Sequence, residues 1–124
     1  MGSKADVVRE YIAAIAAGEV EGVAAMVSDD VVFHMPGRNV TSGDHTKGPW
    51  LEMFKGMVER SGGSMQVEVH DLLESEDHVV ALVRRTMAGV DSRAAIVLHV
   101  AEGKITEVWP FEGDQYAIDE AMSR

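Results

Sequence analysis

Five histidines supply most of the acid–base chemistry that this sequence could perform near neutral pH, because the imidazole ring titrates there. His34 is the leading candidate, since it stands in the apolar stretch VVFHM (31–35) directly before Pro36-Gly37. Side chains alternate between the faces of a strand, so His34 points away from a pocket that Phe33 and Met35 face, unless the chain is distorted before the proline. A histidine alone on a strand is more often structural or exposed, and both interpretations stay open.

The other histidines are weaker candidates. We keep His99 as a candidate ligand contact, although about half of the side chains on a sheet of hairpins normally face water. His70 and His78 stand near strand ends and turns, where we expect them to be solvated. The pair Asp44-His45 forms either a lid over a site or a simple turn.

Two adjacent arginines, Arg84 and Arg85, stand in a segment that reads as a central strand. Adjacent strand residues point to opposite faces, so one of them must lie on the covered side of the sheet or be twisted out at its end. A buried arginine requires an anionic partner, which Glu112, Asp114 or a ligand carboxylate could supply. We take Arg84 as the candidate substrate contact, and an internal salt bridge is the alternative.

Several other chemistries lack the residues that they need. The chain has no cysteine, so thiolate catalysis and disulfides are excluded. It has no histidine spacing typical of a metal site and no serine in a nucleophile-elbow context. It also lacks a glycine-rich phosphate loop. The sequence therefore predicts neither a metal nor a cofactor.

Composition and charge limit the partners. The 124 residues predict a single domain, 1–124, that is large enough for a hydrophobic core. The net charge of −10 argues against nucleic acid and anionic membranes, which select clusters of Lys and Arg. The absence of cysteine fits a cytoplasmic location.

The hydrophobic pattern changes from helical to strand-like along the chain. Apolar positions spaced by three and four predict helices at 5–17, at 19–27 and from Pro49 onward. Alternating and β-branched segments predict strands at 31–35, 65–75, 78–88, 92–101 and 104–112. Asp114 to Met122 resembles a short terminal helix. This order predicts an α+β domain in which three helices cover one face of a curved antiparallel sheet.

Eight methionines and several aromatic residues predict a deformable apolar pocket, because Met side chains adapt to irregular shapes. The candidate ligand contacts are Phe33, Met35, Trp50, Met53, Phe54, Met57, Thr86, His99, Trp109 and Tyr116. Ordinary core packing is the alternative explanation for the apolar members of this set.

The segment VVREYIAAIAAGEVEGVAAMVSDDVVFHMPG (7–37) resembles the first two helices and first strand of bacterial steroid isomerases. Gly103-Lys104-Ile105 followed by Val108-Trp109 fits the same group. The chain thus resembles the nuclear transport factor 2-like superfamily, and within it the SnoaL-like and ketosteroid isomerase-like proteins. The resemblance implies a cone-shaped, cystatin-like fold with a deep pocket, and frequent homodimers. It does not imply one chemistry, because the fold hosts enzymes and non-catalytic binders.

The resemblance argues against two specific reactions. Steroid isomerases pair a carboxylate base with two acidic donors; Tyr11 matches one donor, but Met35 stands at the base position and Ile96 at the second acid. Epoxide hydrolases use an Asp-Arg-Asp arrangement, of which Arg84 matches only the arginine. Thr86 and Pro110 occupy the two acid positions.

The leading hypothesis is therefore a SnoaL-like, cofactor-independent isomerase or cyclase that acts on a ketone-bearing polycyclic or polyketide-like substrate. In this hypothesis His34 is the base or an orienting donor, Tyr11 binds the substrate oxygen and Arg84 clamps the substrate. The alternative is a non-catalytic module that binds a hydrophobic ligand or forms a dimeric interaction surface.

Overall fold

The computed structural model describes residues 3–61, 65–87 and 89–122. The helices are α1 (Lys4–Ala17), α2 (Val20–Met26), α3 (Lys47–Ser61) and α4 (Gln115–Met122). The strands are β1 (Val27–Met35), β2 (Gly43–His45), β3 (Gln66–Glu74), β4 (His78–Met87), β5 (Val90–Ala101) and β6 (Lys104–Glu112). Strand β3 ends at Glu74, one residue before its predicted end, and the predicted end of the next strand at residue 88 lies outside the described residues.

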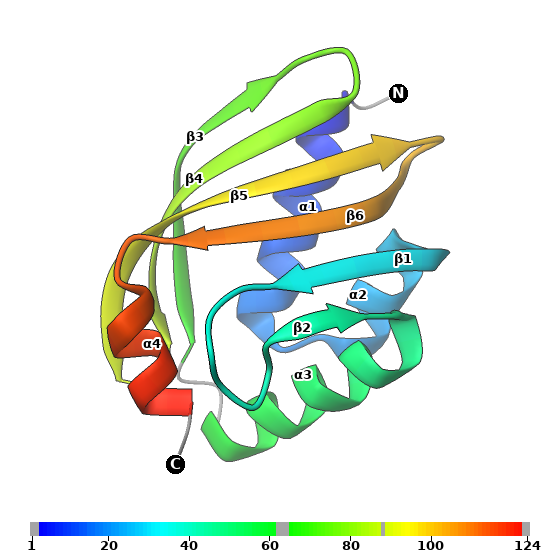
Figure 1. Cartoon of the computed structure of the whole chain (residues 1–124). Coiled ribbons are helices and arrows are strands. Elements are labelled where there is room, and N and C mark those ends of the chain that lie inside the picture. The colour runs from blue at the N-terminus through cyan, green and yellow to red at the C-terminus, as the bar shows by residue number, and fades with distance from the viewer. Residues whose placement is uncertain (1–2, 62–64, 88, 123–124) are drawn as a thin grey trace.

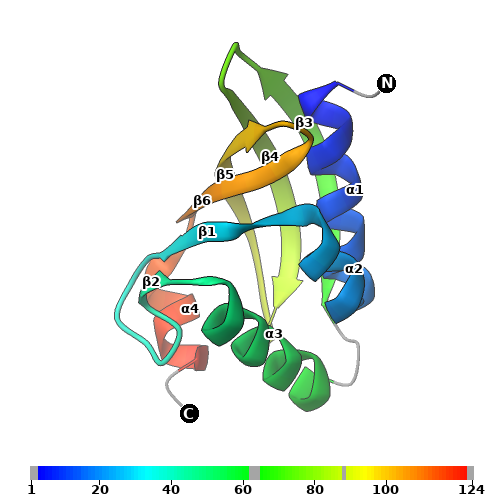
Figure 2. The same cartoon turned by 90° about the vertical axis from the view of Figure 1, so that its right-hand side faces the viewer.

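The six strands form one sheet in the order β2-β1-β6-β5-β4-β3. Helices α1, α2 and α3 lie on one side of it: α1 contacts β3 and β4, and α3 lies against β1 (Figures 1 and 2). Helix α4 follows β6 and packs at one end of the sheet. The predicted α+β fold, with three N-terminal helices covering a curved sheet, is confirmed.

Three details of the sheet differ from the sequence prediction. The sheet is not wholly antiparallel, because β1 pairs with β6 in parallel while every other neighbouring pair is antiparallel. The segment Gly43 to His45 was expected to be a turn or lid, yet it forms the edge strand β2 against β1. Residues 28–30, which fall between the predicted helix at 19–27 and the predicted strand at 31–35, also belong to β1, where the pairing with β6 shifts register between Val27 and Val32.

Helix α1 begins and ends where its sequence specifies. The Ser3 hydroxyl accepts a hydrogen bond from the Asp6 backbone N–H, and the Asp6 carboxylate accepts one from the Ser3 backbone N–H. Both N–H groups lack a partner within the helix, and these two bonds satisfy them. Gly18 ends the helix in the left-handed conformation (φ 70°), which glycine adopts without strain. A Cβ at Gly18 would lie 3.0 Å from Val58 of α3, so the glycine also lets α3 approach closely.

The alternation of each strand decides which side chains face the helices. In β4, Val79, Ala81 and Val83 are buried beneath α1, so Leu82 and Arg84 lie on the outer face. In β1, Val31 and Phe33 are buried in the same way. No helix within the described residues is long and apolar enough to cross a membrane.

Candidate functional site

The sheet and helices α1 and α3 enclose an apolar cavity of about 100 Å³, which we call the inner cavity. Its walls come from α1, α3, β1, the residues after β1, and strands β3 to β6. They are formed by Tyr11, Ile12, Ile15, Phe33, Met35, Thr41, Trp50, Met53, Phe54, Met57, Met65, Val67, Arg85, Ile96, Val108 and Pro110. Seven of the residues that the sequence singled out are therefore in one place: Tyr11, Phe33, Met35, Trp50, Met53, Phe54 and Met57.

A stack of three aromatic rings forms one wall. Phe33 of β1 and Trp50 of α3 lie face to face, with ring centroids 3.9 Å apart and planes at 3°. Phe54 follows one helical turn after Trp50, at 5.3 Å. All three side chains are buried, so this wall is rigid, whereas Met53 and Met57 can adapt to a guest.

Four lining residues carry polar side-chain N or O atoms: Tyr11, Thr41, Trp50 and Arg85. Burial raises the pKa of Tyr11 above its ordinary value of 10.0, and the nearby positive charge of Arg85 opposes this rise only in part. The Tyr11 hydroxyl is therefore neutral at physiological pH and can donate a hydrogen bond. Tyr11 and Arg85 together provide two donors within a largely apolar cavity.

Arg85 is held in place by a buried ion pair. Its Nη2 donates to Oε2 of Glu112 on β6, and the side chains of Arg85 and Glu112 are only 12% and 4% exposed. Burial lowers the pKa of Arg85, but an arginine remains charged at any physiological pH. Nε of Arg85 and Oε1 of Glu112 are buried without a hydrogen-bond partner among the described residues. The internal salt bridge that the sequence left open therefore exists, but at Arg85 rather than at Arg84.

A second lobe of about 60 Å³ adjoins the inner cavity and extends to α4. The two hollows share Met35, Thr41, Met57, Arg85 and Pro110 as lining residues. Glu112 lines the second lobe, together with residues of α4 and of the loop after β1. Arg85 thus stands at the junction of an apolar compartment and a more polar one.

The loop after β1 is fastened to α4 by one carboxylate. Oδ1 of Asp119 accepts hydrogen bonds from the Arg38 backbone N–H at 3.0 Å, from Asn39 Nδ2 at 2.8 Å and from Gln115 Nε2 at 2.9 Å. Gly37 adopts φ 86°, and a Cβ there would lie 2.2 Å from Asp119 Oδ1. Two of these donors, Asn39 and Gln115, also line the second lobe.

His34 lies on the outer face of the sheet and does not line the inner cavity. Strand β1 keeps its alternation up to Met35, so the complete burial of Phe33 directs His34 outward. Its Nδ1 is 2.9 Å from Asp44 Oδ1, its Nε2 is 2.8 Å from Glu107 Oε2, and its ring stacks on Trp109 at 5.1 Å. The expectation that His34 could act in the pocket therefore has no geometric support.

Five other predicted site residues also lie away from the inner cavity. Arg84 points outward and forms an ion pair with Asp91 at 2.9 Å. Thr86 borders a separate hollow beside Arg84, and the side chain of His99 pairs with Thr106 Oγ1 at 2.9 Å. The indole of Trp109 stacks on His34, and Tyr116 is 90% exposed. Arg84, Thr86, His99 and Trp109 lie on strands. Successive side chains of a strand alternate between its two faces, and these four point to the outer face.

Sequence reasoning missed Arg85 as a lining residue, although a usable signal was present. Arg85 is in phase with Val79, Ala81 and Val83, so counting in steps of two from the buried valines assigns it to the covered face. Ile96 and Pro110, which stand where the resemblance places enzymatic acids, do line the inner cavity. Both positions therefore line the cavity in this chain, but they carry apolar side chains where the resemblance places acids.

A model of the SnoaL-like domain family matches residues 8–108, which is most of the chain. The chain belongs to the SnoaL-like family. An uncharacterized protein of Mycobacterium tuberculosis (strain H37Rv) is 28% identical to this SnoaL-like chain, and the match covers 92% of both. The predicted family membership is confirmed.

Several solved structures share the fold of this SnoaL-like chain over nearly its whole length. A protein of unknown function with a cystatin-like fold from Xanthomonas campestris is 30% identical, with a TM-score of 0.86 over 96% of this chain and 97% of that one. Bal32a, from a soil-derived mobile gene cassette, is 26% identical, with a TM-score of 0.84 over 97% and 95%. A nuclear transport factor 2-like protein of unknown function from Cytophaga hutchinsonii, 17% identical with a TM-score of 0.75 over 95% and 99%, supports the fold alone.

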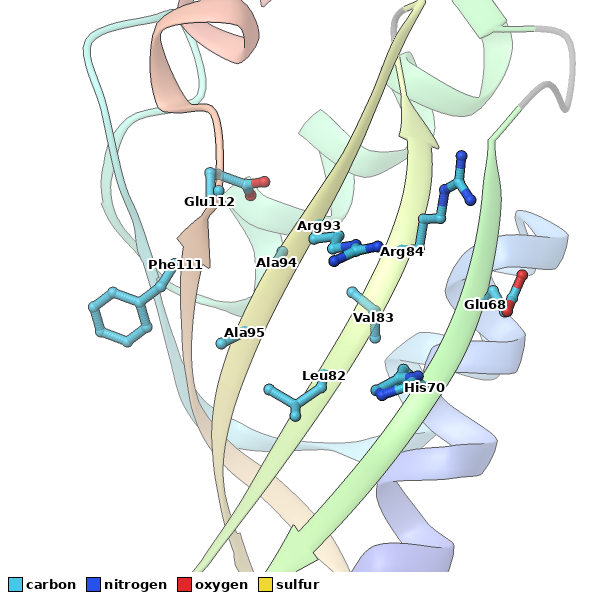
Figure 3. Close-up of a pocket in the computed structure, with 11 residues that line it drawn as sticks. Glu68, His70, Leu82, Val83, Arg84, Arg93, Ala94, Ala95, Phe111 and Glu112 are labelled. Carbon is cyan, nitrogen blue, oxygen red and sulfur yellow. The ribbon is translucent and has the colours of Figure 1, made fainter.

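The outer face of this SnoaL-like sheet carries a further hollow, an open groove of about 560 Å³. Leu82, Ala95 and Phe111 are direct cross-strand neighbours on β4, β5 and β6, and they form its apolar floor. Arg84 and Arg93 face each other across β4 and β5, as Figure 3 shows (Figure 3). Phe111 is 58% exposed, so this outer groove is a partly apolar surface open to solvent.

Proposed function

We propose that this SnoaL-like protein binds a small, largely apolar molecule in the inner cavity, with a ligand oxygen directed at Tyr11 and Arg85. One observation carries the proposal: a partly enclosed, largely apolar cavity whose wall contains the hydroxyl of Tyr11 and the guanidinium of Arg85. Ligand sites commonly combine apolar walls with a few placed polar groups. The two donors are near each other, since the positive charge of Arg85 acts to lower the pKa of Tyr11.

The size of the cavity favours ligands of about one ring. The inner cavity and the second lobe measure about 100 and about 60 Å³, which is below the ~300–1,000 Å³ usual for drug-sized ligands. Larger, polycyclic guests would require the wall to move. Met35, Met53, Met57 and Met65 are the lining residues that can do so at the lowest cost.

Two tyrosines provide a matched test of this proposal. Tyr11→Phe removes the cavity hydroxyl, and Tyr116→Phe removes a hydroxyl on a side chain that is 90% exposed. We expect Tyr11→Phe to weaken the binding of a one-ring ketone such as acetophenone about five- to tenfold, in keeping with the loss of one hydrogen bond. Tyr116→Phe should leave the affinity unchanged in isothermal titration calorimetry. Equal effects of the two variants would contradict the proposal.

A second candidate function is a cofactor-independent isomerase or cyclase that acts on a ketone. Tyr11 and Arg85 are two donors that could stabilise an enolate oxygen, which favours this candidate. Such a reaction needs a base within reach of the substrate, and His34 lies behind the sheet. Glu112 is the one carboxylate among the described residues that line either lobe. The isomerase candidate therefore requires Glu112 as its base, and we rank it second to binding.

Exchange of ketone α-protons for solvent deuterium tests the catalytic candidate directly. If the protein enolises a bound ketone, NMR should show exchange that is faster than in buffer. That exchange should disappear in Glu112→Gln and persist in His34→Ala. If a bound ketone exchanges no faster than the free ketone, the protein is a binder rather than an enolising enzyme.

A homodimer in the cytoplasm remains a prediction, and the outer face of the sheet is the surface that best suits a second copy. Phe111 and Leu73 are exposed there, and Leu82 and Ala95 are partly exposed beside them. Light scattering on the wild type and on Phe111→Glu tests the dimer. A charge at this position should shift the mass from that of a dimer to that of a monomer.

A further inference from the structure

The cavity that we propose as the ligand site contains a cation together with its own anion. Among the described residues that line the two lobes, Arg85 is the only basic side chain and Glu112 the only acidic one. The two form an ion pair that is almost completely buried. Any polar end of a ligand that reaches Arg85 therefore also comes close to the charge of Glu112.

We propose that Glu112 makes the cavity selective for uncharged oxygen-bearing ligands, such as ketones, esters, amides and phenols, and excludes carboxylates of the same size. This inference rests on the proposed ligand-binding function. Glu112 is on this view a specificity-determining residue that acts through Arg85.

The charge balance of the pair supplies the physical reason. Arg85 and Glu112 neutralise each other, so an entering carboxylate would add a second negative charge without a second positive one. Removing a charge from water without a partner costs far more than removing a neutral carbonyl oxygen. A neutral oxygen can accept from Tyr11 or from Arg85 and leaves the pair intact.

Glu112 is anchored by strand pairing, and its side chain is buried. It lies opposite Ala94 in the β5–β6 pairing, near the end of β6, and its side chain is 4% exposed. Its Oε1 is buried and has no hydrogen-bond donor among the described residues. This oxygen is the group that would repel an incoming carboxylate.

Two probes of similar size, acetophenone and benzoate, test the selectivity by calorimetry. The wild type should bind acetophenone at least about tenfold more tightly than benzoate. In Glu112→Gln, Arg85 loses its counter-ion, and benzoate affinity should rise at least about tenfold while acetophenone affinity changes little. Glu68→Gln, which removes an exposed carboxylate on β3, is the matched control and should keep the wild-type ratio.

A pH series on the wild type tests the same inference without any variant that could fail to fold. The hydroxyl of 4-nitrophenol ionises near neutral pH, so its affinity should fall by about tenfold for each pH unit above that ionisation. The affinity of acetophenone should stay constant over the same range.

The failures of the two proposals are distinguishable. Wild-type protein that binds acetophenone but also binds benzoate or nitrophenolate as tightly overturns the selectivity alone. An unchanged ratio of affinities in folded Glu112→Gln does the same. If wild-type protein binds none of the probes, the ligand-binding function itself is overturned, and the selectivity with it.

Discussion

Arg84 and Arg85 are adjacent in β4, yet they lie on opposite faces of the sheet and have different partners. Arg84 forms an exposed ion pair with Asp91, and Arg85 forms a buried one with Glu112. The two residues share chemistry and backbone context, so a comparison between them isolates the effect of burial. The ion pair of Arg85 is the polar feature around which the proposed site is built.

Replacement of each arginine by methionine should separate the two ion pairs energetically. Arg85→Met leaves Glu112 buried without its counter-ion, and we expect a loss of about 3–5 kcal/mol in the free energy of unfolding. Arg84→Met removes only an exposed pair and should cost less than ~1 kcal/mol. Urea denaturation followed by circular dichroism measures both. Equal losses would show that Arg85 and Glu112 do not form a buried pair in solution.

A double variant tests whether the cost belongs to the unpaired charge. Arg85→Met/Glu112→Met removes both charges at once, and apolar replacements of a buried pair are often close to neutral. We therefore expect the double variant to recover most of the stability that Arg85→Met loses. A double variant less stable than Arg85→Met would contradict this explanation.

His34 should make stability depend on pH in a defined direction. Hydrogen bonds to Glu107 and Asp44 raise the pKa of His34 above its ordinary value of 6.5. The stabilising contribution is therefore complete below about pH 6.5 and is lost as the pH rises through the folded-state pKa. NMR titration of the ring protons measures this pKa, and unfolding midpoints on either side of it measure the loss, which should be absent in His34→Gln. A His34 that titrates below 6.5 would contradict the paired geometry.

Two glycines provide a matched test of the contact between the loop after β1 and α4. Gly37→Ala places a Cβ in a left-handed backbone position and within 2.2 Å of Asp119 Oδ1, so we expect a loss of about 1–3 kcal/mol. Gly48→Ala introduces a Cβ that meets nothing within 4 Å, near the start of α3, and should be neutral or slightly stabilising. Thermal unfolding of the two variants measures the difference. Equal melting temperatures would mean that the contact at Asp119 contributes nothing.

Local patterns predicted most of the fold because helix and strand periodicity are local properties. The helical spacing of 5–17 and the alternation of 78–88 and 92–101 correspond to α1, β4 and β5. Pairing is not local, so the parallel contact of β1 with β6 could not be read from either strand. The three residues of β2 carry no strand pattern of their own, since Gly43, Asp44 and His45 are extended only because they pair with β1.

The apolar part of the site was predicted better than its polar part. Phe33, Met35, Trp50 and Phe54 line the inner cavity, because large apolar side chains in phase with a core face are buried there. The polar predictions favoured His34 and Arg84 for their chemistry, although strand alternation assigns both to the outer face. Contact of any of these residues with a ligand remains a prediction.

The central claim is that a ligand occupies the inner cavity, and NMR of methyl-labelled methionines tests it most directly. Met35, Met53, Met57 and Met65 line the inner cavity, whereas Met26 is absent from its walls. Titration with acetophenone should shift the methyl signals of these four residues in a saturable manner and leave that of Met26 in place. Saturable binding that leaves the four cavity methyl signals unmoved would contradict the account.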